Sequence, residues 1–183
     1  MIGFLDIEAS SLSAASHPIE ISVVFETGTG ETYLIRSEPT WTDWAYDSAQ
    51  VHGITREDLV ADGSSAADVA RRLSAALAGH DMASDAPEQD TKWLTKLMQP
   101  AALPTPPIWN ATDVFITATR PLFGRLPSSV AHSLARSILM QAETEMERAD
   151  GIRHRAGPDA RRLWLTWQRV GILVSDALEG WPT

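Results

Sequence analysis

Two acidic residues lie in an apolar stretch near the start of the sequence. Residues 2–9 are mostly bulky or β-branched, which predicts a buried strand, yet Asp6 and Glu8 interrupt them. Because successive side chains of a strand alternate between its faces, both carboxylates should point to the same side. Carboxylates this close repel each other unless a cation lies between them, and oxygen ligands on a rigid strand suit Mg²⁺ or Mn²⁺. The simpler alternative is a strand end whose acids reach solvent.

The composition limits the kind of metal site and the number of domains. The chain has 183 residues, of which 44% are hydrophobic, so we expect a single α/β domain over residues 1–183. It contains no cysteine, which excludes disulfides and thiolate zinc sites. A metal would therefore be held by oxygen ligands, and this again favours Mg²⁺ or Mn²⁺.

The charge limits the kind of partner. A formal net charge of −9 argues against a broad basic face that binds long duplex nucleic acid. Two bound divalent ions would change the net charge from −9 to −5. A short single strand bound through its end is more compatible with this charge than a long duplex. The sequence has no apolar run of about 18 residues and no secretory leader pattern. We therefore expect a cytoplasmic protein without membrane contact.

Apolar patterns and turn residues predict a mixed sheet of five strands flanked by helices. The first strand contains Asp6, and Gly28-Thr-Gly30 turns the chain between the next two strands, which form a hairpin. Thr55, Ser65 and Pro87 are placed to begin helices. The later strands are expected at Ile19–Phe25, Thr32–Arg36, His80–Asp85 and Ile108–Thr117, and the last two helices at 127–151 and 159–178.

An aromatic loop lies between the third strand and the first helix. Residues 37–47 contain Trp41, Trp44 and Tyr46. These side chains either cover one edge of the sheet or stack on a nucleobase, because aromatic faces bind bases with little sequence preference.

Three further residues give the acidic pair its context. Asp90 lies just inside a helix that follows a strand, and His154 precedes Asp159 by five residues at the start of the last helix. This order of residues resembles the DEDDh group of DnaQ-like 3′-5′ exonucleases, which belong to the RNase H-like superfamily. The resemblance rests on Phe4-Leu-Asp-Ile-Glu8, Pro18-Ile-Glu-Ile21, Val51-His-Gly-Ile-Thr55, Ala83–Leu94 and His154–Ala160, and it covers most of the chain.

The resemblance implies a mechanism and a role for each matching residue. Four acids, Asp6, Glu8, Asp90 and Asp159, would hold two divalent ions, Mg²⁺ or Mn²⁺, for hydrolysis of a phosphodiester. His154 would take the proton from the attacking water, because its ordinary pKa is close to working pH and a mobile approach to the last helix would let it close over the substrate. By the same resemblance Leu12 would wedge against the terminal bases and His52 would lie along the path of the strand.

The sequence departs from the family pattern at two places. Many members have Thr-Thr-Gly after the first-motif glutamate, whereas this chain has Ala9-Ser10-Ser11. The family usually has His-Asn ahead of the second-motif aspartate, and Ser84-Asp85 stands there instead. Two acids are therefore candidates for the second-motif ligand. Asp90 is preferred because Trp93 and Leu94 follow it at the family's spacing, and Asp85 is the alternative ligand or otherwise a substrate contact.

The function implied by the resemblance is metal-dependent release of nucleoside monophosphates from the 3′ end of single-stranded DNA or RNA. Two alternatives stay open. One is a non-catalytic nucleic-acid-binding or adaptor domain that keeps the fold, and the other is an oligoribonuclease restricted to very short RNA. The sequence distinguishes neither DNA from RNA nor a monomer from a homodimer.

Overall fold

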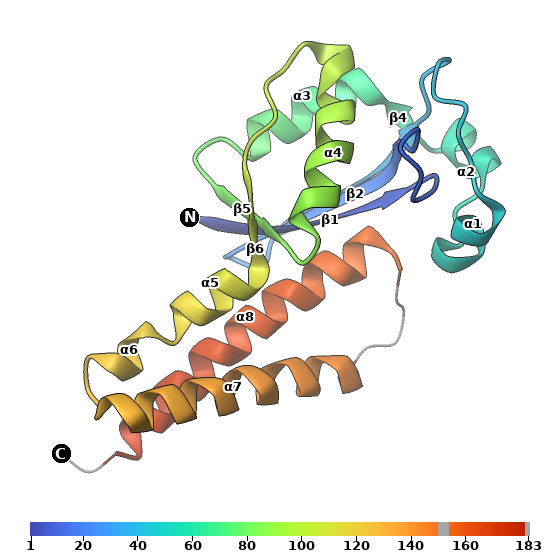
Figure 1. Cartoon of the computed structure of the whole chain (residues 1–183). Coiled ribbons are helices and arrows are strands. Elements are labelled where there is room, and N and C mark those ends of the chain that lie inside the picture. The colour runs from blue at the N-terminus through green and yellow to red at the C-terminus, as the bar shows by residue number, and fades with distance from the viewer. Residues whose placement is uncertain (150–153, 182–183) are drawn as a thin grey trace.

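The computed structural model describes residues 1–149 and 154–181. Its centre is a six-stranded mixed sheet with the order β4-β3-β2-β1-β5-β6 (Figure 1). Strand β1 pairs antiparallel with β2, and β2 with β3, whereas the pairs β1–β5, β5–β6 and β3–β4 are parallel. The strands are β1 (Ile2–Ala9), β2 (Pro18–Phe25), β3 (Gly30–Arg36), β4 (Ser64–Ser65), β5 (Asp81–Ser84) and β6 (Ile108–Asn110).

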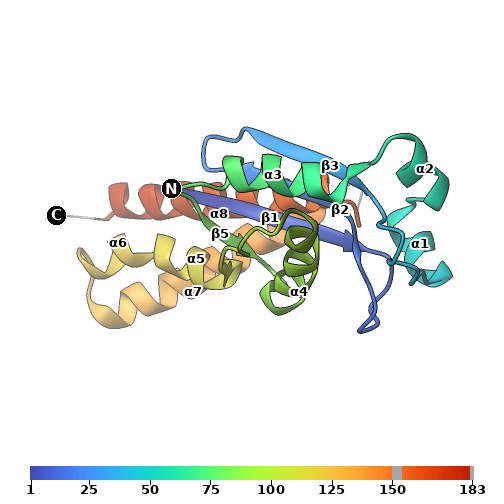
Figure 2. The same cartoon turned by 90° about the horizontal axis from the view of Figure 1, so that it is seen from above.

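Helices cover both faces of the sheet, which gives three layers (Figures 1 and 2). Helices α3 (Ala66–Ala76) and α4 (Pro87–Met98) pack on one face, with the 3₁₀ turn η1 (Gln99–Ala101). On the other face α8 (Ala156–Glu179) crosses β1 and β2 and is backed by α5 (Ala111–Ala118), α6 (Arg120–Phe123) and α7 (Ser128–Ala149). Helices α1 (Tyr46–His52) and α2 (Arg56–Ala61) lie beyond the end of β1. None of the helices in the described ranges is long and apolar enough to cross a membrane.

The predicted fold class is confirmed, and the sheet has one strand more than the five that were expected. The additional strand β4 has two residues, Ser64 and Ser65, which is too short for a period-2 pattern. Ser65 also caps α3 as predicted, because its side chain accepts a hydrogen bond from the Asp68 backbone N–H. Thr55 forms a capping box with Asp58 at the start of α2.

The expected strand Ile108–Thr117 is wrong over most of its length. Only Ile108–Asn110 forms a strand, and Ala111–Ala118 is the helix α5. The Asn110 side-chain oxygen accepts a hydrogen bond from the Thr112 backbone N–H at 2.8 Å, so this residue caps the helix. The run of β-branched residues after it favours a strand by propensity, but Phe115 packs into the core as part of a helix. The predicted helix end at Gly151 and the mobile approach to His154 lie outside the described residues.

The alternation of side chains along β1 places the acidic pair. Leu5 and Ile7 belong to the core beneath α3 and α4, whereas Phe4 belongs to the core beneath α8. Asp6 and Glu8 share the Phe4 side of the strand by period-2 geometry. The two carboxylates therefore lie between the sheet and the first turn of α8.

Candidate active site

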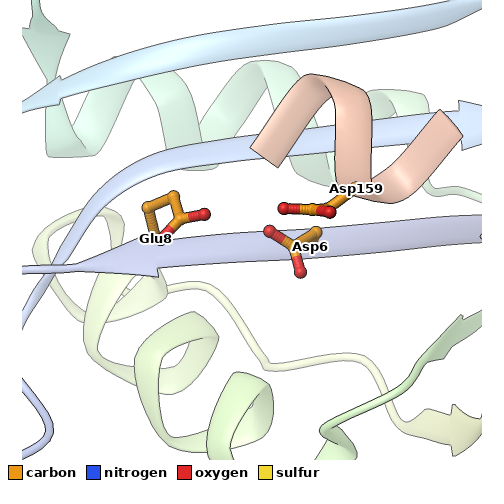
Figure 3. Close-up of side chains that lie close together, drawn as sticks. All are labelled: Asp6, Glu8 and Asp159. Atoms are coloured by element: carbon orange, nitrogen blue, oxygen red, sulfur yellow. The ribbon is translucent and has the colours of Figure 1, made fainter. Parts of the chain in front are cut away.

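Three carboxylates converge where β1 meets the first turn of α8. Asp6 and Glu8 come from the strand and Asp159 from the helix, and their ligand oxygens lie within 4.8 Å of one another (Figure 3). Residues 6 and 159 are far apart in sequence, and the packing of α8 across β1 and β2 brings them together. The acidic pair is therefore not a strand end that only meets solvent.

The two strand acids lie in an environment that disfavours their charges. Burial raises the pKa of Asp6 well above its ordinary value, and the charges of Asp90 and Glu8 raise it further. Burial and the charge of Asp159 raise the pKa of Glu8 to about 7, with Arg155 acting in the opposite direction. A bound cation would offset both the cost of burying these negative charges and the repulsion between them.

The donor set fits a hard divalent cation. Three carboxylates offer only oxygen, and the two on β1 stand on a strand that is hydrogen-bonded on both sides. Oxygen ligands of this kind are preferred by Mg²⁺ and Mn²⁺ over softer metals. The residues present are therefore suited to the metal that the sequence predicts.

His154 and Asp159 are joined at the start of α8. The Asp159 Oδ2 atom accepts hydrogen bonds from the backbone N–H groups of His154 at 2.9 Å and Arg155 at 3.3 Å. His154 has a φ of 63°, in the left-handed region, where histidine is found more often than most side chains. The exposed imidazole lines the same cavity as the three carboxylates.

A buried glutamate on β2 fixes this segment to the sheet. The Glu20 side chain is 3% exposed and is opposite Glu8 in the strand register. Its Oε2 atom accepts hydrogen bonds from Arg155 Nε at 3.0 Å and from the Ala156 backbone N–H at 2.8 Å, and its Oε1 atom accepts one from Arg155 Nη2 at 2.5 Å. The sequence analysis missed this role, although a glutamate within an apolar strand is itself a signal that a partner is needed.

The two candidates for the second-motif ligand lie in different positions. Asp90, in the first turn of α4, is 2% exposed and accepts a hydrogen bond from the Ser84 hydroxyl. Burial raises the pKa of Asp90 to about 7, although the bond from Ser84 lowers it. Asp85 lines the cavity and pairs with Arg162 at 3.1 Å. Asp90 is thus close enough to affect Asp6 electrostatically, but it lies outside the cluster of three carboxylates.

The carboxylates line a cavity of about 300 Å³. Its walls also carry Glu147 from α7 and Arg162 from α8, neither of which the sequence analysis had singled out. Arg162 stands one turn after Asp159, and its Nε atom is 3.6 Å from Asp159 Oδ1. A basic residue three positions after an acid on a helix is a usable sequence signal for such a pair.

A second, more apolar cavity of about 420 Å³ also includes Glu8 and His154 in its walls. It contains both predicted strand contacts: Leu12, which is 81% exposed, and the buried His52. The His52 Nδ1 atom accepts a hydrogen bond from the Ile54 backbone N–H at 3.0 Å, so Nε2 carries the proton. Nε2 has no hydrogen-bond partner among residues 1–149 and 154–181.

The segment that departs from the family pattern is held by an aspartate. Asp43 accepts hydrogen bonds from the hydroxyls of Ser10 at 3.0 Å, Ser11 at 2.5 Å and Ser13 at 2.9 Å. These serine hydroxyls therefore stabilise the loop in the structure. In the aromatic loop, Trp41 packs against the core beneath α3 and α4, and Trp44 packs against Ile19, Ile54 and Leu59, so both cover the sheet.

Comparisons with known proteins give the fold. No family model and no curated protein matches the sequence. Among solved structures, apo exonuclease I superposes with a TM-score of 0.64 at 17% identity, over 96% of this chain and 43% of that one. A 3′-exonuclease with a histone mRNA stem-loop gives 0.63 at 16% identity, over 97% and 64%. The Escherichia coli exonuclease I complex with single-stranded DNA and zinc gives 0.59 at 16% identity, over 98% and 41%.

The chain has the exonuclease fold. These matches extend over nearly all of this chain. This chain spans less than half the length of the exonuclease I structures that it matches.

Proposed function

We propose that residues 1–183 form a DEDDh-type 3′-5′ exonuclease domain that releases nucleoside monophosphates from the 3′ end of a single strand. The observation that carries this proposal is the convergence of Asp6, Glu8 and Asp159 on a cavity that His154 also lines. The shared fold supports it, since the neighbours in the comparison are nucleases.

The acids supply the metal-binding half of the site. Asp6, Glu8 and Asp159, with Asp90 from α4, would hold two divalent ions, Mg²⁺ or Mn²⁺. Bound ions of this kind supply a nucleophile at neutral pH and stabilise the charge on the leaving oxygen. The raised pKa values of Asp6, Glu8 and Asp90 show how strongly this half of the site favours added positive charge.

The remaining residues bind the strand and move the proton. His154 lines both cavities, so its imidazole can accept the proton of a water that attacks a phosphate between them. The apolar cavity would take the terminal nucleotide, with Leu12 against the base and the His52 Nε2–H as a donor to a base or sugar oxygen. A short RNA is an equally suitable substrate in this geometry.

One observation favours a second candidate, a nucleic-acid-binding domain without turnover. The hydroxyls of Ser10 and Ser11 are bound to Asp43, so they are less available to the terminal nucleotide than the hydroxyls of the usual motif. Binding through the apolar cavity does not depend on those hydroxyls.

A labelled-strand assay tests the proposal. DNA and RNA single strands with a 5′ label are incubated with Mg²⁺, with Mn²⁺ or with EDTA, and products are separated by length. We expect a ladder that shortens from the 3′ end only when metal is present, and no ladder with the Asp6→Ala variant. Turnover that survives chelation contradicts the metal-dependent mechanism, and binding without a ladder supports the binding-domain alternative.

A further inference from the structure

One cationic side chain lies among the acids of the catalytic cavity. Arg162, on α8, places Nη2 3.1 Å from Asp85 Oδ2 and Nε 3.6 Å from Asp159 Oδ1. Its side chain is 27% exposed, whereas that of Asp85 is 47% exposed. Asp85 is therefore the outer partner, on the solvent side of the pair.

The charge of the cavity makes this arginine important for an anionic substrate. Five carboxylates line the cavity, from Asp6, Glu8, Asp85, Glu147 and Asp159, and Arg162 is the only lysine or arginine among its described lining residues. Divalent ions would neutralise the inner acids, but Asp85 would still face an incoming phosphodiester. A guanidinium presents paired N–H donors that match the oxygens of a phosphate.

We propose that Arg162 binds a phosphate of the incoming strand and that Asp85 competes with this phosphate for the guanidinium. The inference rests on the proposed nuclease function and adds a substrate-binding residue to it. In the free protein, Arg162 Nη2 donates a hydrogen bond to Asp85 Oδ2. When a strand binds, its phosphate takes the place of Asp85, which is exposed enough to turn into solvent. Asp85 thus acts on strand binding through Arg162.

The neighbouring arginine provides a matched control. Arg161 has the same charge and stands on the same turn of α8, but its guanidinium lies over the Trp164 ring at 5.4 Å, and the residue is not part of either cavity. Changing Arg161 to alanine alters the net charge by the same amount as changing Arg162. A difference between the two variants therefore reports the position of Arg162 and not its charge alone.

The experiment measures binding and turnover separately. Binding of 5′-fluorescein-labelled dT10 and rU10 is followed by fluorescence anisotropy at saturating CaCl₂ and several KCl concentrations, and kcat and KM are measured with Mg²⁺. For a single strand the slope of log K against log[salt] is about −0.7 for each phosphate that is neutralised. We expect Arg162→Ala to make this slope less steep by about 0.7 and to raise KM by about 10- to 100-fold. Arg161→Ala should change both much less.

Two other variants test the geometry and the competition. Arg162→Lys keeps the charge but loses the paired donors, so we expect KM between those of the wild type and Arg162→Ala. Asp85→Asn removes the competitor and a negative charge, so we expect binding to tighten by about fivefold. Thermal unfolding of every variant is measured to show that each remains folded.

The outcomes separate this inference from the proposed function. Strand binding and cleavage by the wild type, with Arg162→Ala indistinguishable from Arg161→Ala, overturn the Arg162 assignment alone. Weaker binding by Asp85→Asn overturns the role of Asp85 as a competitor. A folded wild-type protein that neither binds nor cleaves either strand overturns both the inference and the proposed function.

Discussion

His154 is the residue whose replacement best distinguishes an exonuclease from a binding domain. It lines the cavity of the three carboxylates, and its backbone N–H donates a hydrogen bond to Asp159 Oδ2, so replacing the imidazole leaves that bond in place. We expect His154→Ala to lower kcat by roughly 10²–10⁴-fold with a much smaller change in KM.

A second histidine serves as the control for that variant. His132 on α7 is exposed and bonds to Ser128, away from both cavities. His132→Ala should therefore keep the wild-type rate at every pH. Equal rates for His154→Ala and the wild type across the pH range would contradict the role of His154 as the general base.

The two acids of the second motif give a further prediction at the residue scale. Asp90 is buried and raises the pKa of Asp6 through its charge, whereas Asp85 is exposed and pairs with Arg162. We expect Asp90→Asn to abolish turnover, measured with the labelled strand in Mg²⁺, because the site loses a charge that the bound metal needs. If Asp90→Asn cleaves normally and Asp85→Asn is inactive, the ligand is Asp85.

The sequence predicted the site residues that belong to a spaced motif and missed those that depend on a partner. Asp6, Glu8 and Asp159 were selected by order and spacing, and the structure brings them together. Glu20 was not selected because its role depends on Arg155, which is distant in sequence. Arg162 was not selected although its spacing from Asp159 was a signal, and its pairing with Asp85 depends on the fold. No pattern along the chain reveals that Glu20 meets Arg155 across 135 positions.

At the scale of elements, the contact between β2 and the start of α8 positions the site. Glu20 binds Arg155 and the Ala156 backbone, directly beside His154. Glu20→Gln removes the charge that holds this turn, so we expect it to lower kcat while strand binding is kept. Because a hydrogen bond to a charged group contributes about 1.5–3 kcal/mol, urea unfolding should show a loss of that order.

The pair between α7 and α8 is the matched control for that contact. Glu145 bonds to Arg169 at 2.6 Å, but both side chains are about a third exposed and neither residue lines the cavity. Glu145→Gln should lower stability much less than Glu20→Gln, because exposed ion pairs contribute little, and it should leave kcat unchanged. A similar kcat for Glu20→Gln and the wild type would show that Glu20 only stabilises the fold.

The helices that were predicted wrongly show how far local sequence patterns can predict secondary structure. Residues 111–118 have β-branched side chains that favour a strand, but they form α5 because Asn110 caps a helix and Phe115 reaches the core. Helix α1 was missed because it has no side-chain cap. The first three strands, by contrast, were predicted well, because their apolar runs are bounded by turn residues.

At the scale of the whole molecule, the repulsion among the clustered carboxylates should lower the free energy of unfolding at neutral pH when metal is removed. Glu8 has a pKa of about 7 in the folded protein against an ordinary 4.5, so between these values the folded state binds more protons than the unfolded state. The free energy of unfolding that depends on Glu8 therefore falls as pH rises through this window. In EDTA at pH 8, Glu8→Gln should be more stable than the wild type by roughly 1–3 kcal/mol.

Comparison of the two proteins isolates this effect from other titrating groups. His17, whose pKa burial lowers to about 4, contributes with the opposite sign but is the same in both proteins. The difference should vanish near pH 4, and Mg²⁺ should stabilise the wild type more than the variant. Denaturant unfolding at pH 4, 6 and 8 measures it, and a difference that does not depend on pH would contradict the raised pKa of Glu8.

The joining of β1 to the first turn of α8 also determines when the protein could act during its own synthesis. Asp159 and the helix that carries it leave the ribosome about 150 residues after Asp6 and Glu8. At roughly 5–20 residues per second this is a delay of about 8–30 seconds. A nascent chain that has folded only its sheet and first helices would thus have no complete acidic cluster until the last helix had docked.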